Sequence, residues 1–382
     1  MRLKTLRKSI GLTLLLGCIL LTGCGGEGAP PETTPEQTTS PPVSIETIEY
    51  TFTVDSAFTS PEETTAPEGQ EEPILSNILT GLPLAEGDEG TRRPVAVVIN
   101  NIKRALPQSG ISQADVIFEI EAEETITRLI AVFSDPSQVG KIGTVRSTRS
   151  AFVNVCAGLD AFMVHAGGSP QSYTDMKQLS VSNIDGIYDG ITFYRDQNRM
   201  KNAGYEHSMY TTGQRLAKKL DALAKAGKRM GLASGYKAPF AFFETDTAPA
   251  NGQKCVKVTT MYGSYHPRFS YQESTGLYLR YEYGAAHMDE DTKTQLAFKN
   301  VVVLSVTSSR IPGDTAMRRQ FNDVGKGTGI YATNGVVVPI QWSKASATAP
   351  LVLMDASGEI LKLNPGKTFI SYVNGTEKFK TE

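Results

Sequence analysis

The run RPVAVVINN, residues 93–101, places a strict condition on the fold of this chain. A continuous run of β-branched and apolar residues predicts a strand that is buried on both faces. Such a strand needs further structure packed on either side. Strand-like and helix-like patterns alternate around it and after it, up to a helical pattern at residues 213–231. We therefore predict an α/β (α+β) N-terminal lobe with a mixed sheet, formed by residues 76–235.

The pattern changes after about residue 237. Short strand-like runs, among them KNVVVLSV, VVVPIQW and KTFISYV, are separated by turn signals such as Asn334-Gly335 and Pro365-Gly366. Many short strands with turns between them are typical of all-β structure. Residues 236–382 are therefore predicted to form a mostly β C-terminal lobe, a roll or a barrel.

The first 23 residues have the features of an export signal. A basic head precedes an apolar stretch that is too short to span a bilayer comfortably, and small residues lie before Cys24. The motif LTGC, residues 21–24, resembles the bacterial lipobox. The resemblance implies a lipoprotein signal peptide over residues 1–23, cleavage before Cys24 and a diacyl anchor on that cysteine, on the extracytoplasmic face of the cell membrane. An uncleaved membrane anchor is the alternative.

Residues 24–75 differ in composition from the rest of the chain. They are rich in Pro, Thr, Ser and Glu, and no Lys or Arg occurs between Lys8 and Arg92. So little apolar surface cannot offset the entropy of ordering, which predicts a disordered tether with an r.m.s. reach of about 40 Å. A functional acidic motif is the alternative.

Charge, cysteine and histidine content argue against several classes of function. Removal of residues 1–23 takes four of the 38 basic residues and none of the 40 acidic ones, so the mature charge is near −6 and nucleic-acid binding is not expected. Cys156 and Cys255 either form one disulfide or, as we favour, remain buried small hydrophobic residues. The four histidines are widely spaced, so we predict no metal site and no cofactor.

Two adjacent segments predict a charged hairpin. Residues 114–123, ADVIFEIEAE, alternate between apolar and acidic side chains, which is typical of a half-exposed strand with Glu119 and Glu121 on its acidic face. Residues 127–136, TRLIAVFSDP, follow as a second strand. A two-residue turn in either of two positions places Arg128 opposite Glu119 or Glu121, which predicts a cross-strand ion pair.

The motif VRSTRS, residues 145–150, places two arginines at the start of the predicted helix AFVNVCAG. Ser147 or Thr148 is the predicted N-cap, so Arg146 and Arg149 flank a helix end that already favours an anion. Cations at this position cost about a few tenths of a kcal/mol unless a negative group lies nearby.

Two kinds of negative partner are open for these arginines. One is internal, a salt-bridge network with Asp115, Glu119 or Glu121. The other is a ligand phosphate or carboxylate, held bidentately by the guanidinium groups. The sequence leaves both hypotheses open.

The motif HAGGSP, residues 165–170, favours the ligand hypothesis. His165 ends a predicted strand, and Gly167 and Gly168 would let a ligand approach the backbone at the edge where open α/β sheets bind ligands. Ser169, which precedes a proline, is predicted to cap the next helix rather than to act as a nucleophile. For His165 itself, which ends a strand alone, a structural role is the interpretation we favour.

Two further histidines are candidates for acid–base chemistry near neutral pH. His207 lies in NAGYEHSMY, and His287 lies in HMDED with Asp289 and Asp291. His287, Asp289 and Asp291 offer metal-ligand chemistry, but their spacing does not distinguish a site from a polar loop or a helix start, which is the interpretation we favour.

Several motifs together resemble the YerB family of Gram-positive lipoproteins, a family classed as a domain of unknown function. They are RPVAVVINN, VRSTRS, HAGGSP, YEHSMYTT, HMDEDT, GKGTGIYATNG and NPGKTFISYV. The resemblance covers nearly all of residues 78–380 and implies an N-terminal α/β part and a C-terminal β-rich part on a lipid anchor, with no established activity. Glu124-Thr125 and Thr144 depart from the family, which usually has Gly-Gly and proline there.

The favoured hypothesis is a non-enzymatic envelope lipoprotein. Its α/β lobe binds an anionic ligand or cell-wall component through Arg128, Arg146, Arg149 and the two helix starts, while the β lobe docks a protein partner.

The alternative is a hydrolase or transferase that acts on a cell-wall or envelope polymer. Glu119 and Glu121, or His165 and His207, would be its acid–base groups. The sequence contains no recognisable nucleophile motif, triad order or metal spacing, which argues against catalysis.

Overall fold

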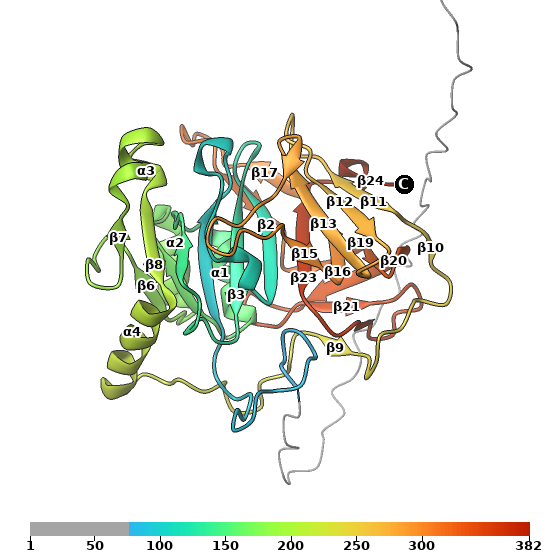
Figure 1. The fold of residues 1–382 in the computed structure, drawn as a ribbon, viewed down its shortest axis with the longest axis horizontal. Helices are drawn as coiled ribbons and strands as arrows, with labels where there is room; N and C mark the ends of the chain where they lie inside the picture. Colours follow the sequence, from blue (N-terminus) through green and yellow to red (C-terminus); the bar gives the residue numbers. More distant parts are fainter. Residues whose placement is uncertain (1–75) are drawn as a thin grey trace, which may run out of the picture. The chain divides into compact units, whose positions relative to one another are not determined.

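The computed structural model describes residues 76–382 (Figure 1). The predicted signal peptide, Cys24 and the predicted tether at residues 24–75 lie outside the described residues. Among the described helices, none is both long enough and apolar enough to cross a membrane.

An eleven-stranded mixed sheet runs through the described part of the chain. Its strands lie in the order β10-β20-β19-β16-β23-β2-β3-β1-β5-β6, and β21 pairs with β20. Their bounds are β1 Val95–Asn100, β2 Val116–Glu123, β3 Ile126–Phe133, β5 Phe162–His165, β6 Asn183–Asp185, β10 Gln253–Lys254, β16 Asn300–Ser305, β19 Gly325–Thr333, β20 Val336–Lys344, β21 Val352–Met354 and β23 Thr368–Val373.

Strands from both predicted lobes take part in this sheet. In the N-terminal part, β1, β5 and β6 are parallel and β3 is antiparallel, so the predicted mixed sheet is confirmed. β23, from the C-terminal part, lies parallel to β2 on one side and to β16 on the other. The sheet thus continues across the boundary at residue 235, and that boundary stays a prediction.

A second layer covers one face of the main sheet over most of its length. It consists of a six-stranded antiparallel sheet, a three-stranded sheet and the helix α4, which together close one hydrophobic core (Figure 1). The elements are β4 Lys141–Gly143, β7 Tyr194–Arg195, β8 Met209–Thr212, α4 Gly213–Lys225, β11 Lys257–Thr260, β12 Arg268–Gln272, β13 Leu277–Glu282, β14 Ala285–Ala286, β15 Ala297–Phe298 and β24 Phe379–Thr381.

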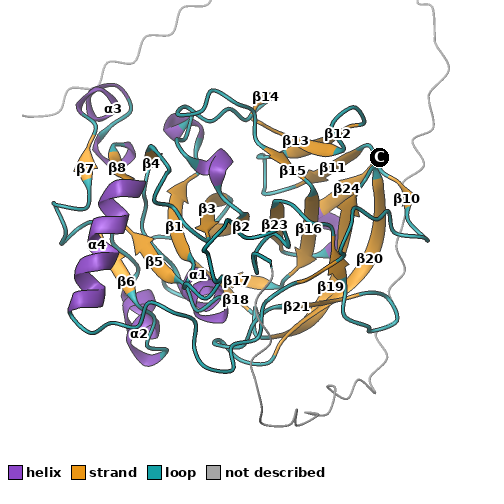
Figure 2. Cartoon of the chain, turned by 60° about the horizontal axis from the view of Figure 1, so that its bottom comes forward, coloured by secondary structure: helices purple, strands orange, loops and turns teal. Residues whose placement is uncertain are grey.

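Helices α1 (Ser150–Gly158) and α2 (Pro170–Gln178) pack on the opposite face (Figure 2). Phe152 and Met176 from these helices join a second core with Val98 and Val132 of the sheet. Because both faces are covered, all six residues of β1 are buried, as its sequence predicts. The remaining elements are α3 Gln197–Asn202, the pair β17 Ser308–Arg310 and β18 Arg319–Phe321, and the pair β9 Ala241–Phe242 and β22 Lys362–Leu363.

The prediction that β2 has an acidic, half-exposed face is wrong. Every residue of β2 except Glu123 is buried, and Glu119 has no exposed surface. The six-stranded sheet covers this face and supplies Arg280, which compensates the charge of Glu119. The alternation of β2 therefore separates two buried environments rather than core from solvent.

The predicted cross-strand ion pairs of Arg128 with Glu119 or Glu121 are also wrong. The two-residue turn is present at Glu124-Thr125, but a β-bulge shifts the register between β2 and β3. Arg128 consequently lies opposite Ile120. A shift of one residue moves a side chain to the other face of a sheet, which separates Arg128 from both predicted partners.

The ends of the helices test three further expectations. Arg149 is the N-cap of α1, in place of the predicted Ser147 or Thr148. Ser169 caps α2 by accepting a hydrogen bond from the backbone N–H of Ser172, and Pro170 is the first helical residue, as predicted. The helix predicted at 213–231 ends at Lys225.

Both cysteines in the described part of the chain are free. Cys156 and Cys255 are buried, which confirms the favoured prediction of two small hydrophobic residues over a disulfide. Burial raises the pKa of the Cys156 thiol to about 12, so it stays protonated at neutral pH.

Candidate functional site

The fold brings the motifs VRSTRS and HAGGSP side by side at the end of β1 and β5. The backbone N–H of Arg146 donates to the carbonyl of Val98, and its carbonyl accepts from the N–H of Ala166. Two residues later, the N–H of Thr148 donates to the carbonyl of Gly167 at 2.9 Å. The segment is therefore fixed between the two parallel strands.

Arg128 of β3 lies next to the same segment, because it is paired with Asn100 at the end of β1. We call Arg128, Arg146 and Arg149 the arginine cluster. Its central carboxylate is Glu123, which the bulge turns toward Arg128. Arg128 Nη2 donates to Glu123 Oε2 at 2.9 Å and to Oε1 at 3.1 Å, and Arg149 Nη2 donates to the same Oε1.

The remaining contacts of the cluster are to backbone oxygens and to the surface. Arg128 Nη1 donates to the carbonyl of Ser147, and Arg149 Nη1 to that of Thr148. Arg146 Nη2 donates to Glu206 Oε2 at 2.8 Å, and Glu206 is mostly exposed. The internal partners predicted for Arg146 and Arg149, namely Asp115, Glu119 and Glu121, are not the ones they contact.

Positive charge exceeds negative charge in this cluster. Burial and, to a smaller extent, the nearby charge of Arg149 together lower the pKa of Arg128 to about 9, against the opposing effect of Glu123. Burial also lowers the pKa of Arg149. Within the described residues, the buried Nε atoms of Arg146 and Arg149 have no hydrogen-bond partner.

His207 lies beside the cluster. Asn100 Nδ2 is 2.8 Å from His207 Nδ1. Because an amide nitrogen donates, Nδ1 accepts and the neutral ring carries its proton on Nε2. Burial lowers the pKa of His207 and the charge of Arg146 adds to this shift, which fits a neutral ring.

His165 has a structural environment. Its ring is fully buried and contacts the carbonyl of Gly167 at 2.9 Å and Asn183 Oδ1 at 3.3 Å. Gly167 has a φ of 77°, which favours glycine, and its N–H donates to Asp185 Oδ1. A Cβ atom on Gly168 would lie 2.6 Å from Ser172 Oγ. These residues shape the loop between β5 and α2.

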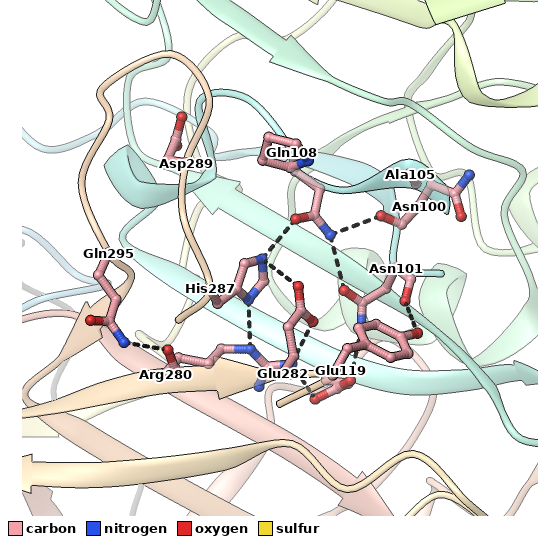
Figure 3. Close-up of polar contacts among 12 residues, drawn as sticks. Asn100, Asn101, Ala105, Gln108, Glu119, Arg280, Glu282, His287, Asp289 and Gln295 are labelled. Carbon is pink, nitrogen blue, oxygen red and sulfur yellow. Dashed lines mark hydrogen bonds and ion pairs between the residues drawn. The ribbon is translucent and has the colours of Figure 1, made fainter. Parts of the chain in front are cut away.

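Glu119 belongs to a different group of residues, which joins the main sheet to the six-stranded sheet (Figure 3). We call this group the interlayer network; it consists of Asn101, Gln108, Glu119, Tyr265, Arg280, Glu282 and His287. Arg280 Nη2 donates to Glu119 Oε2 at 3.1 Å and lies 3.7 Å from Glu282 Oε2, which accepts from the Tyr265 hydroxyl.

His287 and two amides complete the interlayer network. Arg280 Nε donates to His287 Nδ1 at 2.9 Å, so the neutral ring carries its proton on Nε2, which is 2.7 Å from Gln108 Oε1. Gln108 Nε2 donates to Asn101 Oδ1, and Asn101 Nδ2 donates to Glu119 Oε1. Every member is buried, so the network stabilises the contact between the layers and offers no route for a ligand.

Arg280 and Glu282 lie outside every motif that predicts a site. Their signal is the alternation in residues 277–282, which places both side chains on the same face of β13 as the buried Tyr278. The segment HMDED forms a loop, in keeping with the favoured interpretation, and His287 and Asp289 in it are buried. Asp289 accepts hydrogen bonds from the backbone N–H groups of Gly110 and Ser112.

The structure removes support from the predicted acid–base pairs. Glu119 and His165 are fully buried, and Glu121 is buried with Arg319 Nε at 3.1 Å from its Oε2 atom. Cavities of about 500 and 440 Å³ are lined by other residues. Among the described residues, no group of three or more His, Cys, Asp or Glu side chains is placed to hold a metal ion.

Comparisons with known proteins agree with this architecture. Residues 79–227 match the N-terminal domain, and residues 256–370 the C-terminal domain, of a family described as "Protein of unknown function (DUF3048)". The "Putative lipoprotein YerB" of Bacillus subtilis (strain 168) is 31% identical over 302 residues, which cover 77% of this chain and 85% of the relative. The crystal structure of the YerB protein from Bacillus subtilis matches with a TM-score of 0.69 and 29% identity, over 81% of this chain and 99% of that one. The chain therefore belongs to the DUF3048 family of YerB-like proteins.

Proposed function

We propose that this chain is an envelope lipoprotein, anchored through Cys24 on the extracytoplasmic face of the cell membrane, whose arginine cluster binds an anionic ligand. A phosphate or carboxylate group of a cell-wall component has the geometry that guanidinium donors bind bidentately. The description of the Bacillus subtilis relative as a lipoprotein supports the anchor.

One observation carries the proposed anion site. Arg128 and Arg149 share the carboxylate of Glu123, while Arg146 pairs with a surface glutamate. A buried cation that is not fully compensated is costly, and an incoming anion would relieve that cost. The lowered pKa of Arg128 and the unpaired Nε atoms of Arg146 and Arg149 support the same conclusion.

The position of the cluster supports the proposal as well. Helix α1 begins at Ser150 with no side-chain cap, so its first backbone N–H groups add positive potential next to Arg149. The cluster also lies at the carboxyl end of the parallel strands β1 and β5, where open α/β sheets bind ligands.

A thermal-shift experiment tests the proposed site. The mature chain with Cys24→Ser, which cannot be lipidated, is heated with phosphate, sulfate, sugar phosphates, dicarboxylates and wall fragments. A ligand at 100 times its dissociation constant adds about 2.7 kcal/mol to the stability of the folded state. We expect at least one of these anions to raise the melting temperature.

Three variants identify the groups responsible. The double variant Arg146→Ala, Arg149→Ala removes both guanidinium groups and should abolish the shift in melting temperature. The double variant Arg146→Lys, Arg149→Lys keeps the charge and should retain part of that shift. Arg92→Ala is the control, because Arg92 forms an exposed pair with Asp135. Full ligand binding by the double alanine variant would contradict the proposal. So would a parent that responds to none of the anions while the double variant melts much lower, which would make the arginines purely structural.

A further inference from the structure

The loop between β6 and β7 presents three large apolar side chains to solvent. Ile187 is 54% exposed, Tyr188 82% and Ile191 87%. The loop lies at the left of the molecule in Figure 1, next to α4. We call these three side chains the apolar loop tip. Large apolar side chains gathered in one exposed loop are a feature of interaction surfaces.

Hydrogen bonds hold this loop in one conformation. Asp185 Oδ1 accepts from the N–H of Ile187, and Asp189 Oδ1 accepts from the N–H groups of Ile191 and Thr192. Asp189 Oδ2 accepts from the Thr192 hydroxyl and pairs with Lys219 at 2.8 Å. These bonds restrain the backbone of the loop, which lowers the entropic cost of ordering it when the apolar side chains bind.

Basic residues of α4 adjoin the apolar loop tip. Arg215 on α4 donates to the carbonyl of Ile191, and Lys218 on the same helix is exposed. Helix α4 carries Arg215, Lys218, Lys219 and Lys225 against the single acid Asp221. A small apolar surface that includes a tyrosine and is flanked by cations is the combination that binds the interface of an anionic bilayer.

We propose that the apolar loop tip inserts into the headgroup region of an anionic lipid bilayer and docks the folded part of the chain on the membrane. The choice of a bilayer rests on the anchor proposed at Cys24 and on the 51 residues between it and residue 76. A tether of the kind predicted from their composition has an r.m.s. reach of about 40 Å, which would keep the loop at a high effective concentration near the membrane. At such a concentration, three side chains that bind the bilayer weakly are enough to hold the folded part on the membrane.

The docked state also orients the proposed anion site. A Cβ atom on Gly167 would lie 3.4 Å from Ile187 Cγ1 and 3.5 Å from Ser147 Oγ, so the loop adjoins the segment that carries Arg146 and Arg149. Docking through Ile187 therefore places the arginine cluster near the membrane surface. The docking itself does not depend on an anion bound there.

A fluorescence experiment on tethered protein tests the docking. The mature chain carries an N-terminal hexahistidine tag in place of Cys24 and is held on vesicles that contain a nickel-chelating lipid, with phosphatidylglycerol or phosphatidylcholine as the bulk lipid. The native chain has one tryptophan, Trp342, which is buried. Tyr188→Trp adds a reporter at the loop tip, and Ile360→Trp adds a matched reporter at an isoleucine that is 55% exposed elsewhere.

We expect the emission of the Tyr188→Trp reporter to shift to the blue on phosphatidylglycerol vesicles and to be quenched by brominated lipid, while the Ile360→Trp reporter changes little. In the tethered Tyr188→Trp protein, the added change Ile191→Asp should lower partitioning of the loop into these vesicles about tenfold or more, as read from the loss of the blue shift and of the quenching, since burial of one isoleucine is worth that factor. Ile360→Asp should leave partitioning unchanged. Both sites are exposed, so both variants should melt like the parent.

Four results would overturn the proposal. The first is an equal response of the two reporters on the tethered chain. The second is equal partitioning of Ile191→Asp and Ile360→Asp. The third is a blue shift of the Tyr188→Trp reporter that depends on protein concentration without vesicles, which would identify a second copy of this chain as the partner. Loss of lipid binding in the Arg146→Ala, Arg149→Ala variant with full binding by Ile191→Asp would assign lipid binding to the anion site and not to the loop.

Discussion

Glu123 holds the arginine cluster together at the scale of single residues. Its two carboxylate oxygens contact both Arg128 and Arg149, and its side chain is largely buried. The neutral variant Glu123→Gln leaves two cations near each other without a counter-charge. We expect it to lower the free energy of unfolding by about 3 kcal/mol, which urea denaturation would measure. Sulfate should raise the free energy of unfolding more for Glu123→Gln than for the parent.

Glu206→Gln is the matched control for that change. Glu206 pairs with Arg146 at the surface, where the loss of an ion pair costs about 0 to 1 kcal/mol. If both variants lost the same stability, or if sulfate acted equally on both, the charge excess assigned to the cluster would be wrong.

Glu282 makes the stability of the folded state depend on pH. Burial raises the pKa of Glu282 from its usual value of 4.5 to about 7, although the charge of Arg280 opposes this shift. The folded chain thus holds this proton more tightly than the unfolded chain. The stabilising contribution is fully present below pH 4.5 and is lost as the pH rises to about 7.

The variant Glu282→Gln isolates this contribution. Burial and Arg280 lower the pKa of His287, which acts in the opposite direction, so the difference between parent and variant is the informative quantity. From pH 4.5 to about 7, we expect the variant to gain stability relative to the parent, as measured by urea denaturation at each pH. Parallel profiles would show that Glu282 keeps an ordinary pKa.

Local sequence patterns predict most of the helices and strands. They do not predict the β-bulge near Ala122, on which the contacts of the arginine cluster depend. The buried run of β1 and the capped start of α2 have local causes, namely continuous β-branched residues and a Ser-Pro pair. The bulge near Ala122 has no comparable signal, yet it shifts the register by one residue. That shift brings Glu123 to Arg128 and separates Arg128 from Glu119.

The capping role of Ser169 gives a prediction at the scale of the element. Ser169 Oγ accepts the N–H of Ser172 at 3.2 Å, and Thr212 Oγ1 accepts the N–H of Arg215 at the same distance on α4. Ser169→Ala and Thr212→Ala should each lower the free energy of unfolding by about 1 kcal/mol. An unchanged melting temperature for Ser169→Ala would show that the hydroxyl is not the cap of α2.

At the scale of the whole molecule, the interlayer network could not be predicted from local patterns. Glu119 and Arg280 are 161 residues apart, and only the packing of the six-stranded sheet on the main sheet brings them together. Two alternating strands, β2 and β13, each present charged residues that resemble a solvent-facing pattern when read alone. Their charges compensate each other in the buried interface.

This arrangement predicts that the two parts of the chain fold as one unit. In residues 76–235 alone, β2 would lose β23 as its neighbour, which leaves an open sheet edge, and Glu119 would lose Arg280. In residues 236–382 alone, β23 would lose β2, and Arg280 would lose Glu119. We expect neither fragment to unfold cooperatively in urea and an equimolar mixture to recover the transition of the chain from residue 76. A cooperative transition in the fragment 76–235 by itself would mean that the predicted boundary separates two independent domains, because a shared sheet cannot be divided without loss of its pairing.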